Sequence, residues 1–347
     1  MGHPFRIREI AQQSGLSEAT VDRVLHQRPG VRESTIAEVR RAIGELERQR
    51  DQVRLGGRTL LVDLVMQAPA RFSTAVRGAL EAELAHLSPA TLSPATLRAR
   101  FHLREEGTPA ELAAVLDRLR TRGSHGVILK APHDPVVALA VDRLAEAGIP
   151  VVTLVTDLPS SRRIGYVGID NRAAGATAAY LLTRLGSSTG AVLVTLSRSS
   201  FRGEEEREAG FRAALREMAP ARRIVEVGET DGLDASMLAA AGSALAAEPD
   251  IETVYSIGGG NRAILEAFAR LGREPVAFVA HDLDGDNTTL LRQGRLTAVL
   301  HHDLRADLRQ ACRLILHDNG ATTRRPSATP SQVQIITPHN QPNRLGG

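Results

Sequence analysis

From residue 59 onward the chain alternates short apolar runs with amphipathic stretches of helical length. The apolar runs are rich in Val, Ile and Leu, and a helical pattern stands between most of them. They occupy residues 59–66, 125–131, 149–155, 163–169, 190–196, 223–228, 251–257, 275–280 and 296–301. Near-continuous apolar strands that alternate with helices are typical of parallel sheets with both faces covered. Roughly 280 residues exceed what one such sheet needs, so the pattern predicts two doubly wound α/β lobes.

The first 58 residues follow a helical period instead. Ile10 and Ala11 lie on the apolar side of a first short helix, which Gly15 ends. Ser17 is a favoured N-cap for a second short helix, because its hydroxyl can accept from a free N–H of the first turn. Two short helices joined by a glycine-containing turn predict an all-α helix-turn-helix, and a third helix follows after Pro29. A three-helix bundle that binds no DNA has the same spacing, so the pattern alone leaves both interpretations open.

The formal net charge of +3 lies entirely in this N-terminal segment. Residues 1–58 carry eleven arginines against eight acidic side chains, whereas the rest of the chain carries 32 side chains of each sign. This is a modest positive footprint for binding a polyanion. Lys130 is the only lysine beside 42 arginines, which indicates a GC-rich coding sequence more than a functional choice.

Absent patterns narrow the classes of function. Cys312 is the only cysteine, which excludes an intrachain disulfide and a thiolate metal cluster. No apolar run approaches the roughly 20 residues that span a bilayer, and the N-terminus lacks the apolar segment of a secretory signal, so we expect a cytoplasmic protein. A P-loop, a GxSxG nucleophile elbow and a dinucleotide fingerprint are absent, so we expect neither an enzyme nor a cofactor. His301 and His302 are adjacent in an expected strand and face opposite sides, so we expect no shared metal ion.

The sequence IREIAQQSGLSEATVDRVL, followed by PGVRESTIAEVRRAIGEL, resembles the DNA-binding headpiece of the LacI/GalR family of bacterial regulators. The resemblance covers the turn, the recognition helix and the third helix in order and spacing. It implies that the second helix enters the major groove with its N-terminus first. Arg23 would then contact guanine, and Glu18 and Ala19 would face base edges. Ser17 and Thr20 would bind phosphate and fix the register.

Beyond the recognition helix the chain departs from the family pattern. His26 stands at a position often held by asparagine, and it either contacts the DNA backbone or makes no contact. Family members continue with a Tyr-x-Pro-Asn motif and a hinge helix, whereas this chain has a shorter, arginine-rich segment at 47–58 without that motif. Leu55 stands where the hinge leucine that wedges into the minor groove is expected. The alternative is that this segment extends the third helix and contacts phosphates.

Residues 59–318 resemble the ribose-type periplasmic binding proteins and the effector domains of LacI-type repressors, through segments such as RIGYVGIDN, SIGGGN and AHDLD. In this fold a ligand lies between two lobes, at the carboxyl ends of the strands. The resemblance implies an aromatic side chain that stacks on a sugar face, a clamping arginine, and polar groups that bind hydroxyls. The positions that match these roles are Phe72, Asp157, Arg207, Asn261, Asp282 and His302.

Some of these positions have a purely structural alternative. Arg207 can pair with Glu204 or Glu208 on its own helix, and Asp282 can cap the helix that follows. Lys130 replaces a small residue at a strand end. Near the cleft its ammonium group would favour an anionic ligand, and the alternative is that it lies outside the cleft. A sugar, a sugar alcohol or a cyclitol is the class of effector that the resemblance implies.

Together these features predict a transcription regulator, of the repressor type, whose operator affinity is controlled by a small effector. The predicted units are a helix-turn-helix at 1–46, a hinge at 47–58, a two-lobed effector-binding and dimerisation domain at 59–338 and a tail at 339–347. The expected partners are double-stranded operator DNA, a sugar-like effector and a second copy of the chain, without a membrane. The alternatives are a sugar receptor without DNA output and a solute-binding protein of a transport system, and the headpiece weighs against both.

Overall fold

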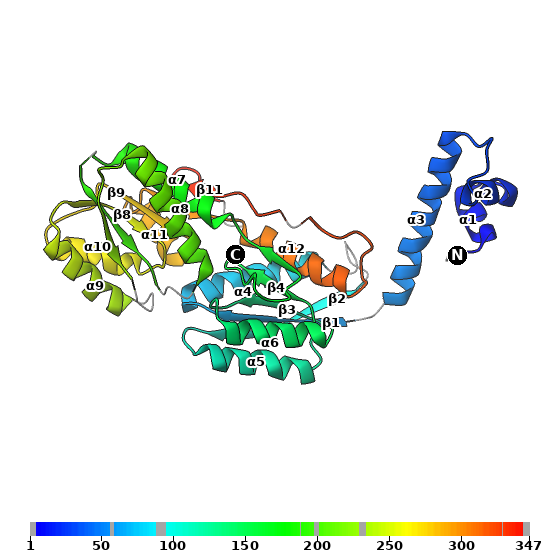
Figure 1. Cartoon of the computed structure of the whole chain (residues 1–347), viewed down its shortest axis with the longest axis horizontal. Helices are drawn as coiled ribbons and strands as arrows, with labels where there is room; N and C mark the ends of the chain where they lie inside the picture. The colour runs from blue at the N-terminus through cyan, green and yellow to red at the C-terminus, as the bar shows by residue number, and fades with distance from the viewer. Residues whose placement is uncertain are drawn as a thin grey trace.

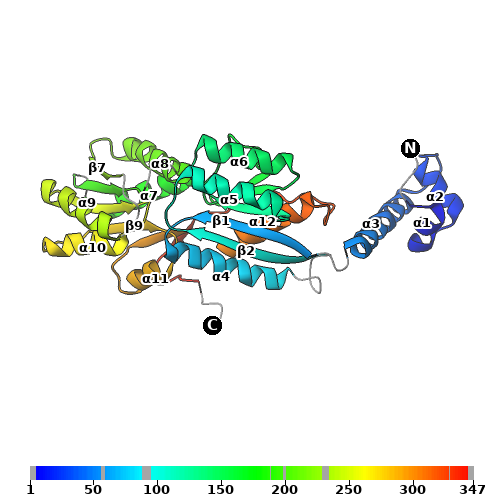
Figure 2. The ribbon, with the colours of Figure 1, turned by 90° about the horizontal axis from the view of Figure 1, so that it is seen from below.

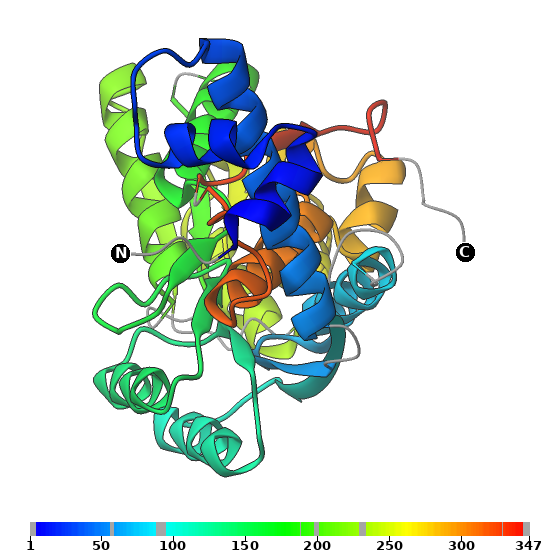
Figure 3. The same cartoon turned by 90° about the vertical axis from the view of Figure 1, so that its right-hand side faces the viewer.

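The computed structural model describes residues 5–55, 59–87, 95–187, 189–197, 201–228, 234–327 and 329–342, except for the side chains of residues 48–55. Three N-terminal helices, which we call the headpiece, lie apart from two α/β lobes that sit side by side (Figure 1). Viewed from its own end of the molecule, the headpiece lies in front of the lobes (Figure 3). The predicted fold class, an N-terminal helix-turn-helix followed by two lobes with parallel sheets, is confirmed.

The first two helices of the headpiece are bounded as the sequence predicts. α1 (Ile7–Ser14) ends at Gly15, whose φ of 70° is the left-handed conformation that glycine adopts without strain. α2 (Glu18–Leu25) begins after Ser17, whose hydroxyl accepts from the backbone N–H of Thr20 at 3.2 Å. A glycine turn and a serine cap therefore fix the angle at which α2 leaves α1.

α3 (Glu33–Leu55) packs on the first two helices and then continues beyond them (Figure 1). Ile10, Val21 and Val39 are fully buried where the three helices meet. At 1.5 Å per residue, α3 is on the order of 35 Å long. It runs through most of the segment 47–58, so the described backbone of that segment continues the third helix.

The first lobe combines residues 59–167 with one helix from much later in the chain. Its strands are all parallel and lie in the order β2-β1-β3-β4-β5. Its elements are β1 (Thr59–Gln67), α4 (Ala70–His86), β2 (Thr96–Arg104), α5 (Pro109–Thr121), β3 (Gly126–Lys130), α6 (Pro135–Glu146), β4 (Val151–Leu154), β5 (Gly165–Val167) and α12 (Leu304–Asp318). α4 and α12 pack on one face of the sheet and α5 and α6 on the other (Figure 2). Because both faces are covered, the inner strands are apolar along almost their whole length.

The second lobe repeats this plan. Its described strands lie in the order β11-β10-β9-β8-β6-β7, and only the pairing of β10 with β11 is antiparallel. Its elements are α7 (Asn171–Leu185), β6 (Ala191–Thr195), α8 (Arg202–Met218), β7 (Ile224–Val227), α9 (Asp234–Ala247), β8 (Ile251–Ser256), α10 (Asn261–Arg270), β9 (Ala277–His281), α11 (Gly285–Arg292), β10 (Ala298–His301) and β11 (Gln334–Ile336). α7 and α8 pack on one face of this sheet, and α9, α10 and α11 on the other.

Three connections within the described residues join the lobes: from β5 to α7, from β10 to α12, and from α12 to β11. α12 follows the second lobe in sequence but packs in the first, where Leu308, Ala311 and Ile315 are fully buried. Ile169 and Ser331, from two different connections, form a β-bridge. The boundary between the lobes is thus built from segments that are far apart in the sequence.

α7 and α8 lie so close together that only glycine fits at two points of their contact. A Cβ atom at Gly175 would lie 1.9 Å from the carbonyl oxygen of Arg207, and one at Gly210 would lie 2.1 Å from that of Arg172. Protein interiors are close-packed and do not accommodate such overlaps without movement of the backbone. This contact fixes the position of Arg207 relative to the helix that begins the second lobe.

Gly210→Ala is expected to lower the free energy of unfolding by about 2 kcal/mol or more, because the added methyl group forces two packed helices apart. Gly242→Ala on α9 is the control, since no atom lies within 4 Å of its Cβ position. At such an open helical position the same change stabilises by up to about 1 kcal/mol. Urea denaturation of both variants measures the difference, and equal stabilities would contradict the close packing of α7 on α8.

Candidate functional site

The N-terminal half of α2 presents its polar side chains to solvent. Of the α2 positions expected to contact DNA, Thr20 is half-buried and the others are exposed: Ser17, Glu18, Ala19, Arg23 and His26. Within the described part of the chain, Arg23 forms no ion pair, so its guanidinium group is available for a base edge. The expected contact through Leu55 lies outside the described side chains.

The end of α2 is held by Asp22. The carboxylate of Asp22 lies 3.0 Å from Nδ1 of His26 and 3.0 Å from Nη1 of Arg28. The ion pair with Arg28 offsets a negative charge that would repel the phosphates of a bound duplex. The expected contact of His26 with the DNA backbone is thus compatible with its position beside Asp22.

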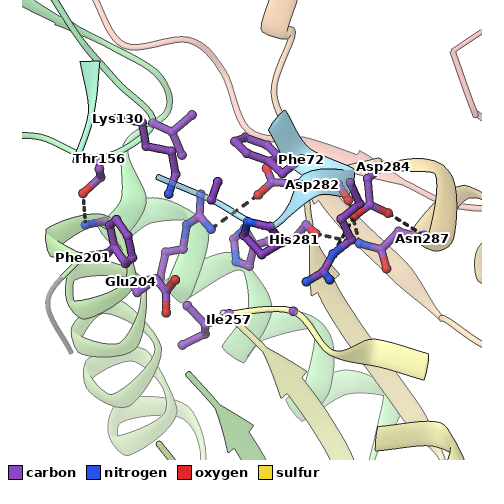
Figure 4. Close-up of a pocket in the computed structure, with 18 residues that line it drawn as sticks. Phe72, Lys130, Thr156, Phe201, Glu204, Ile257, His281, Asp282, Asp284 and Asn287 are labelled. Carbon is purple, nitrogen blue, oxygen red and sulfur yellow. Dashed lines mark hydrogen bonds and ion pairs between the residues drawn. The ribbon is translucent and has the colours of Figure 1, made fainter. Parts of the chain in front are cut away.

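A cavity lies between the lobes, at the carboxyl ends of β1, β3 and β4 on one side and of β8 and β9 on the other (Figure 4). This is the usual ligand position in open α/β sheets. Its volume is about 80 Å³. A single water needs roughly 10–15 Å³, so the cavity holds several waters or one small molecule. Charged groups reach it from both lobes: Arg71, Lys130, Glu204, Arg207, Asp282 and Asp284.

Arg207 on α8 and Asp282 after β9 form the centre of the cavity wall. Nε of Arg207 donates to Oδ1 of Asn171 at 2.8 Å, and its Nη1 lies 4.0 Å from Oδ2 of Asp282. Nη2 of Arg207 is buried without a hydrogen-bond partner, whereas Oδ1 of Asp282, also buried, faces Nε2 of His302 at 3.5 Å. Buried polar atoms are nearly always hydrogen-bonded, so the donor that Arg207 leaves in the cavity wall is suited to a polar ligand.

His302 lies behind Asp282 and is almost completely buried. Its Nε2 is 3.5 Å from the carboxylate of Asp282, and its Nδ1 is in short contact with Asp307 on α12. Burial alone would lower the pKa of His302, but the two carboxylates outweigh burial and raise it to about 9. Burial would raise the pKa of Asp282, yet His302 and Arg207 hold it below its usual range. Asp282 therefore carries its negative charge into the cavity at neutral pH.

Lys130 stands at the end of β3 and is buried. Its Nζ donates to the carbonyl oxygen of Gln67 at 3.2 Å and lies 4.0 Å from the centre of the Phe201 ring. Burial lowers the pKa of Lys130 to about 8, although the carboxylates of Glu204 and Asp282 oppose this effect. At pH 7 the amine is mainly protonated, so a buried ammonium group forms part of the cavity wall.

The backbone is left-handed at two non-glycine residues that line the cavity. Val155 has a φ of 66° and Asp282 a φ of 63°. A β-branched residue rarely adopts this conformation, and such strain is concentrated at ligand sites and switch regions. At Val155 the turn presents its carbonyl oxygen to Nδ2 of Asn171 and to the hydroxyl of Tyr166, each at 3.2 Å. The end of β4 is thereby tied to the first connection between the lobes.

Contacts across the cavity hold the lobes together. Nε of Arg71 on α4 lies 3.2 Å from the carboxylate of Asp284, which caps α11. The N–H of Gly203, near the start of α8, donates to Oγ1 of Thr156 at 3.0 Å. Each contact joins a residue of the first lobe to one of the second, so the structure shows the lobes closed on each other.

Phe72, Arg207 and Asp282, three of the six residues expected to bind the effector, line the cavity. Within the described residues Arg207 makes no ion pair on its own helix, and the N-cap of α11 is Asp284 instead of Asp282. The structural alternatives that the sequence leaves open for Arg207 and Asp282 are therefore not what the structure shows.

Two further expected residues lie one layer behind the cavity. His302 contacts Asp282 from behind. Asn261 donates through Nδ2 to Oδ1 of Asn287 at 2.6 Å, and Asn287 lines the cavity. His302 is thus placed to orient Asp282, and Asn261 to orient Asn287.

Asp157 lies outside the cavity lining, contrary to the expectation for it. Its carboxylate forms an ion pair with Arg163 and accepts from Oγ1 of Thr153 at 2.7 Å. These partners all belong to the first lobe, so Asp157 stabilises the turn between β4 and β5.

The sequence analysis missed several residues that line the cavity, among them Arg71, Thr156, Phe201, His281 and Asn287. Thr156 and His281 stand at strand ends, and that position is a signal that could have indicated them. Arg71 and Phe201 lie at the starts of helices and reach the cavity only through the packing of the two lobes, which no local pattern reveals.

No described helix is long and apolar enough to span a bilayer. Among the described residues, no cluster of three or more His, Cys, Asp or Glu side chains is arranged to hold a metal ion.

Comparison with family models identifies both parts of the chain. A model of the periplasmic binding protein domain matches residues 95–317, which is more than half of the sequence. A model of bacterial regulatory proteins of the lacI family matches residues 6–50, which include α1, α2 and most of α3. Both are families of binding and regulatory proteins and not of enzymes. No curated protein matches the sequence.

Solved structures with the same fold include sugar-binding proteins and a regulator. GanP, a glucose-galactose binding protein from Geobacillus stearothermophilus, has a TM-score of 0.71 at 19% identity over 82% of this chain and 99% of its own. An ABC transporter solute-binding protein from Burkholderia graminis, in complex with D-arabinose, has a TM-score of 0.73 at 19% identity over 81% and 96%. A protein from Bacteroides fragilis assigned as a LacI transcriptional regulator has a TM-score of 0.70 at 17% identity over 82% and 98%.

The family models and the geometry agree on the two parts of the molecule. The headpiece exposes the polar face of α2, and the two lobes enclose a cavity lined by charged and aromatic groups. The chain belongs to the periplasmic binding protein domain family and, with the lacI-family helix-turn-helix at its N-terminus, is a LacI-type DNA-binding regulator with an effector domain of the sugar-binding type.

Proposed function

We propose that the protein is a repressor whose affinity for operator DNA is set by a small, sugar-like effector bound between the lobes. The observation that carries this proposal is the buried, partnerless Nη2 of Arg207, which shares the cavity wall with the carboxylate of Asp282. Neighbouring hydroxyl groups can accept from a guanidinium group and donate to a carboxylate at once. The ring of Phe72, on the same cavity, offers an apolar surface to the C–H face of a sugar.

Proteins of the same fold support this class of ligand. GanP is named for glucose and galactose, and the Burkholderia graminis protein contains D-arabinose. At 19% identity the particular sugar does not carry over to this chain. We therefore propose a sugar, a sugar alcohol or a cyclitol, with Asn261 and His302 as positioning residues behind the cavity.

For the headpiece we infer that α2 enters the major groove. Arg23 contacts guanine, Glu18 and Ala19 face base edges, and Ser17 and Thr20 bind phosphates. The solvent exposure of these side chains and their order along α2 support this arrangement. His26 contacts the DNA backbone in the proposal, and the insertion of Leu55 into the minor groove stays a prediction.

A second copy of the chain is part of this proposal, because near-palindromic operators match the two-fold symmetry of a dimer. The effector and the operator favour different arrangements of the same dimer, so each changes the affinity for the other by the same factor. The functional units proposed are a helix-turn-helix unit at 1–46, a hinge at 47–58 into which α3 continues, the effector and dimerisation unit at 59–338 and a tail at 339–347. Such a regulator works where the chromosome is, which places it in the cytoplasm.

Arg23→Ala is expected to reduce the preference for operator over random DNA by about 1–3 kcal/mol, the value of one bidentate contact with guanine. The operator is first selected from a random duplex library with the wild-type protein. Fluorescence anisotropy titrations with this operator and a scrambled duplex, at one fixed salt concentration, then measure the preference. Arg270→Ala, an exposed position on α10, is the control. An unchanged preference in Arg23→Ala would remove this residue from base recognition.

Arg207→Ala is expected to weaken effector binding by about 2 kcal/mol or more, because a buried charged hydrogen bond is lost. The ligand is chosen by thermal-shift screening of the wild-type protein with D-glucose, D-galactose, D-arabinose, D-glucitol and myo-inositol. Calorimetric titration with the compound that responds then compares the wild type, Arg207→Ala and the Arg270→Ala control. Operator affinity without effector should change little. Equal affinities of wild type and Arg207→Ala for the ligand would show that the assigned cavity is not the effector site.

A further inference from the structure

Lys130 differs from the other basic groups of the cavity in its surroundings. Arg71 and Arg207 face carboxylates at 3.2 and 4.0 Å. Over the described residues, no carboxylate lies within 4.0 Å of Nζ of Lys130. Its two contacts, the carbonyl oxygen of Gln67 and the ring of Phe201, carry no charge. The cavity wall thus holds a buried positive charge that no ion pair within it offsets.

The acidic groups of the cavity do not act as a counter-charge for Lys130. Glu204 is the carboxylate with the largest effect on Lys130, but its two oxygens accept from the hydroxyl and the N–H of Ser197 at 2.6 and 2.9 Å. Asp282 lies between Arg207 and His302, two positive groups. Glu204 is therefore hydrogen-bonded to Ser197, and the charge of Asp282 is offset by Arg207 and His302, so neither carboxylate forms an ion pair with Lys130.

The ammonium group also has unused hydrogen-bonding capacity. It carries three donors, and the bond to Gln67 uses one of them. Figure 4 shows Lys130 pointing down into the cavity, with Glu204 below it and Asp282 to its right. Loss of hydration without a counter-charge is unfavourable for an ammonium group and lowers its pKa, and an anion placed beside Nζ reverses both effects.

We propose that the effector is a small hydroxylated acid, whose anionic group binds Lys130 and whose hydroxyl groups bind Arg207 and Asp282. The proposal rests on the effector function proposed above and narrows its ligand from neutral sugars to sugar acids or sugar phosphates. A carboxylate or a phosphate supplies the acceptors that Nζ still needs, and its charge offsets the buried ammonium. The ring of Phe201, which also lines the cavity, holds Nζ through a cation–π contact.

The test compares acids with their neutral parents on the full chain at pH 7. Isothermal titration calorimetry is carried out with D-glucose, D-glucuronate and D-glucose 6-phosphate, and with D-galactose and D-galacturonate. At least one acid is expected to bind ten-fold or more tightly than its parent sugar. A preference for the uronates identifies a carboxylate as the anionic group, and a preference for the 6-phosphate identifies a phosphate; both support the proposal.

Lys130→Met tests the residue itself, because it keeps the length of the side chain and removes its charge. The preference for the acid over the neutral sugar is expected to fall to three-fold or less in this variant, and operator binding without effector checks that it folds. Arg270→Met removes an equal charge from the exposed face of α10 and should leave the preference unchanged. The wild-type comparison decides by itself even where Lys130→Met fails to fold.

Two results would overturn the anionic effector but not the proposed sugar-like effector. One is that neutral sugars bind the wild-type protein as tightly as their acids, and the other is that the preference for the acid survives in Lys130→Met. Failure of all five compounds to bind, with operator binding intact, would instead overturn the proposed sugar-like effector and the anionic effector together. The two failures are therefore distinguishable.

Discussion

The effector cavity depends on a row of buried polar side chains that runs from one lobe connection to another. Asn171 at the first connection accepts from Arg207, which faces Asp282; His302 at the second connection lies between Asp282 and Asp307 of α12. Positive and negative groups alternate along the row, so each buried charge is offset by its neighbours, as burial requires. Because the row begins and ends at the connections, a change in the angle between the lobes disturbs it. A ligand that bonds to the middle of the row therefore stabilises one lobe angle over others.

β1 links this cavity to the DNA-binding helices. Its first residue, Thr59, follows the end of α3 at Leu55 by four positions, and its last residue, Gln67, adjoins residues that line the cavity. The strand is paired on both sides, with β2 and β3, and most of its side chains are buried, so it moves with the first lobe as one body. Its nine residues span on the order of 30 Å. In the proposed dimer, the lobe angle thus determines where each α3 ends and, through α3, how far apart the two recognition helices stand. This distance has to match the spacing of the operator half-sites.

The parts of the molecule that the sequence predicts are those with local signals. Alternating apolar runs predict the two lobes, and a glycine turn with a serine cap predicts the helix-turn-helix. The composition of the cavity depends on geometry that no local pattern contains. Asp157 and Asp282 both follow a parallel strand, yet a left-handed φ of 63° places Asp282 in the cavity, whereas Asp157 pairs with Arg163 in its own lobe. The place of His302 depends on α12 returning to the first lobe, a packing event between segments more than a hundred residues apart in the chain.

The scarcity of lysine makes the place of Lys130 informative. A GC-rich coding sequence explains why 42 basic residues are arginine, but it does not explain why the single lysine lies in a buried cavity wall. Arginine presents a planar fork of five donors that stays charged at any ordinary pH, whereas lysine presents a compact point charge on a flexible stem. Arg207 already supplies the fork in the same cavity, with directed hydrogen bonds that suit hydroxyl groups. A second arginine would repeat what Arg207 already does. The compact ammonium group of a lysine instead neutralises the charge of an anion. The proposed anionic ligand thus gives a physical reason for a lysine at this position that the composition of the chain does not.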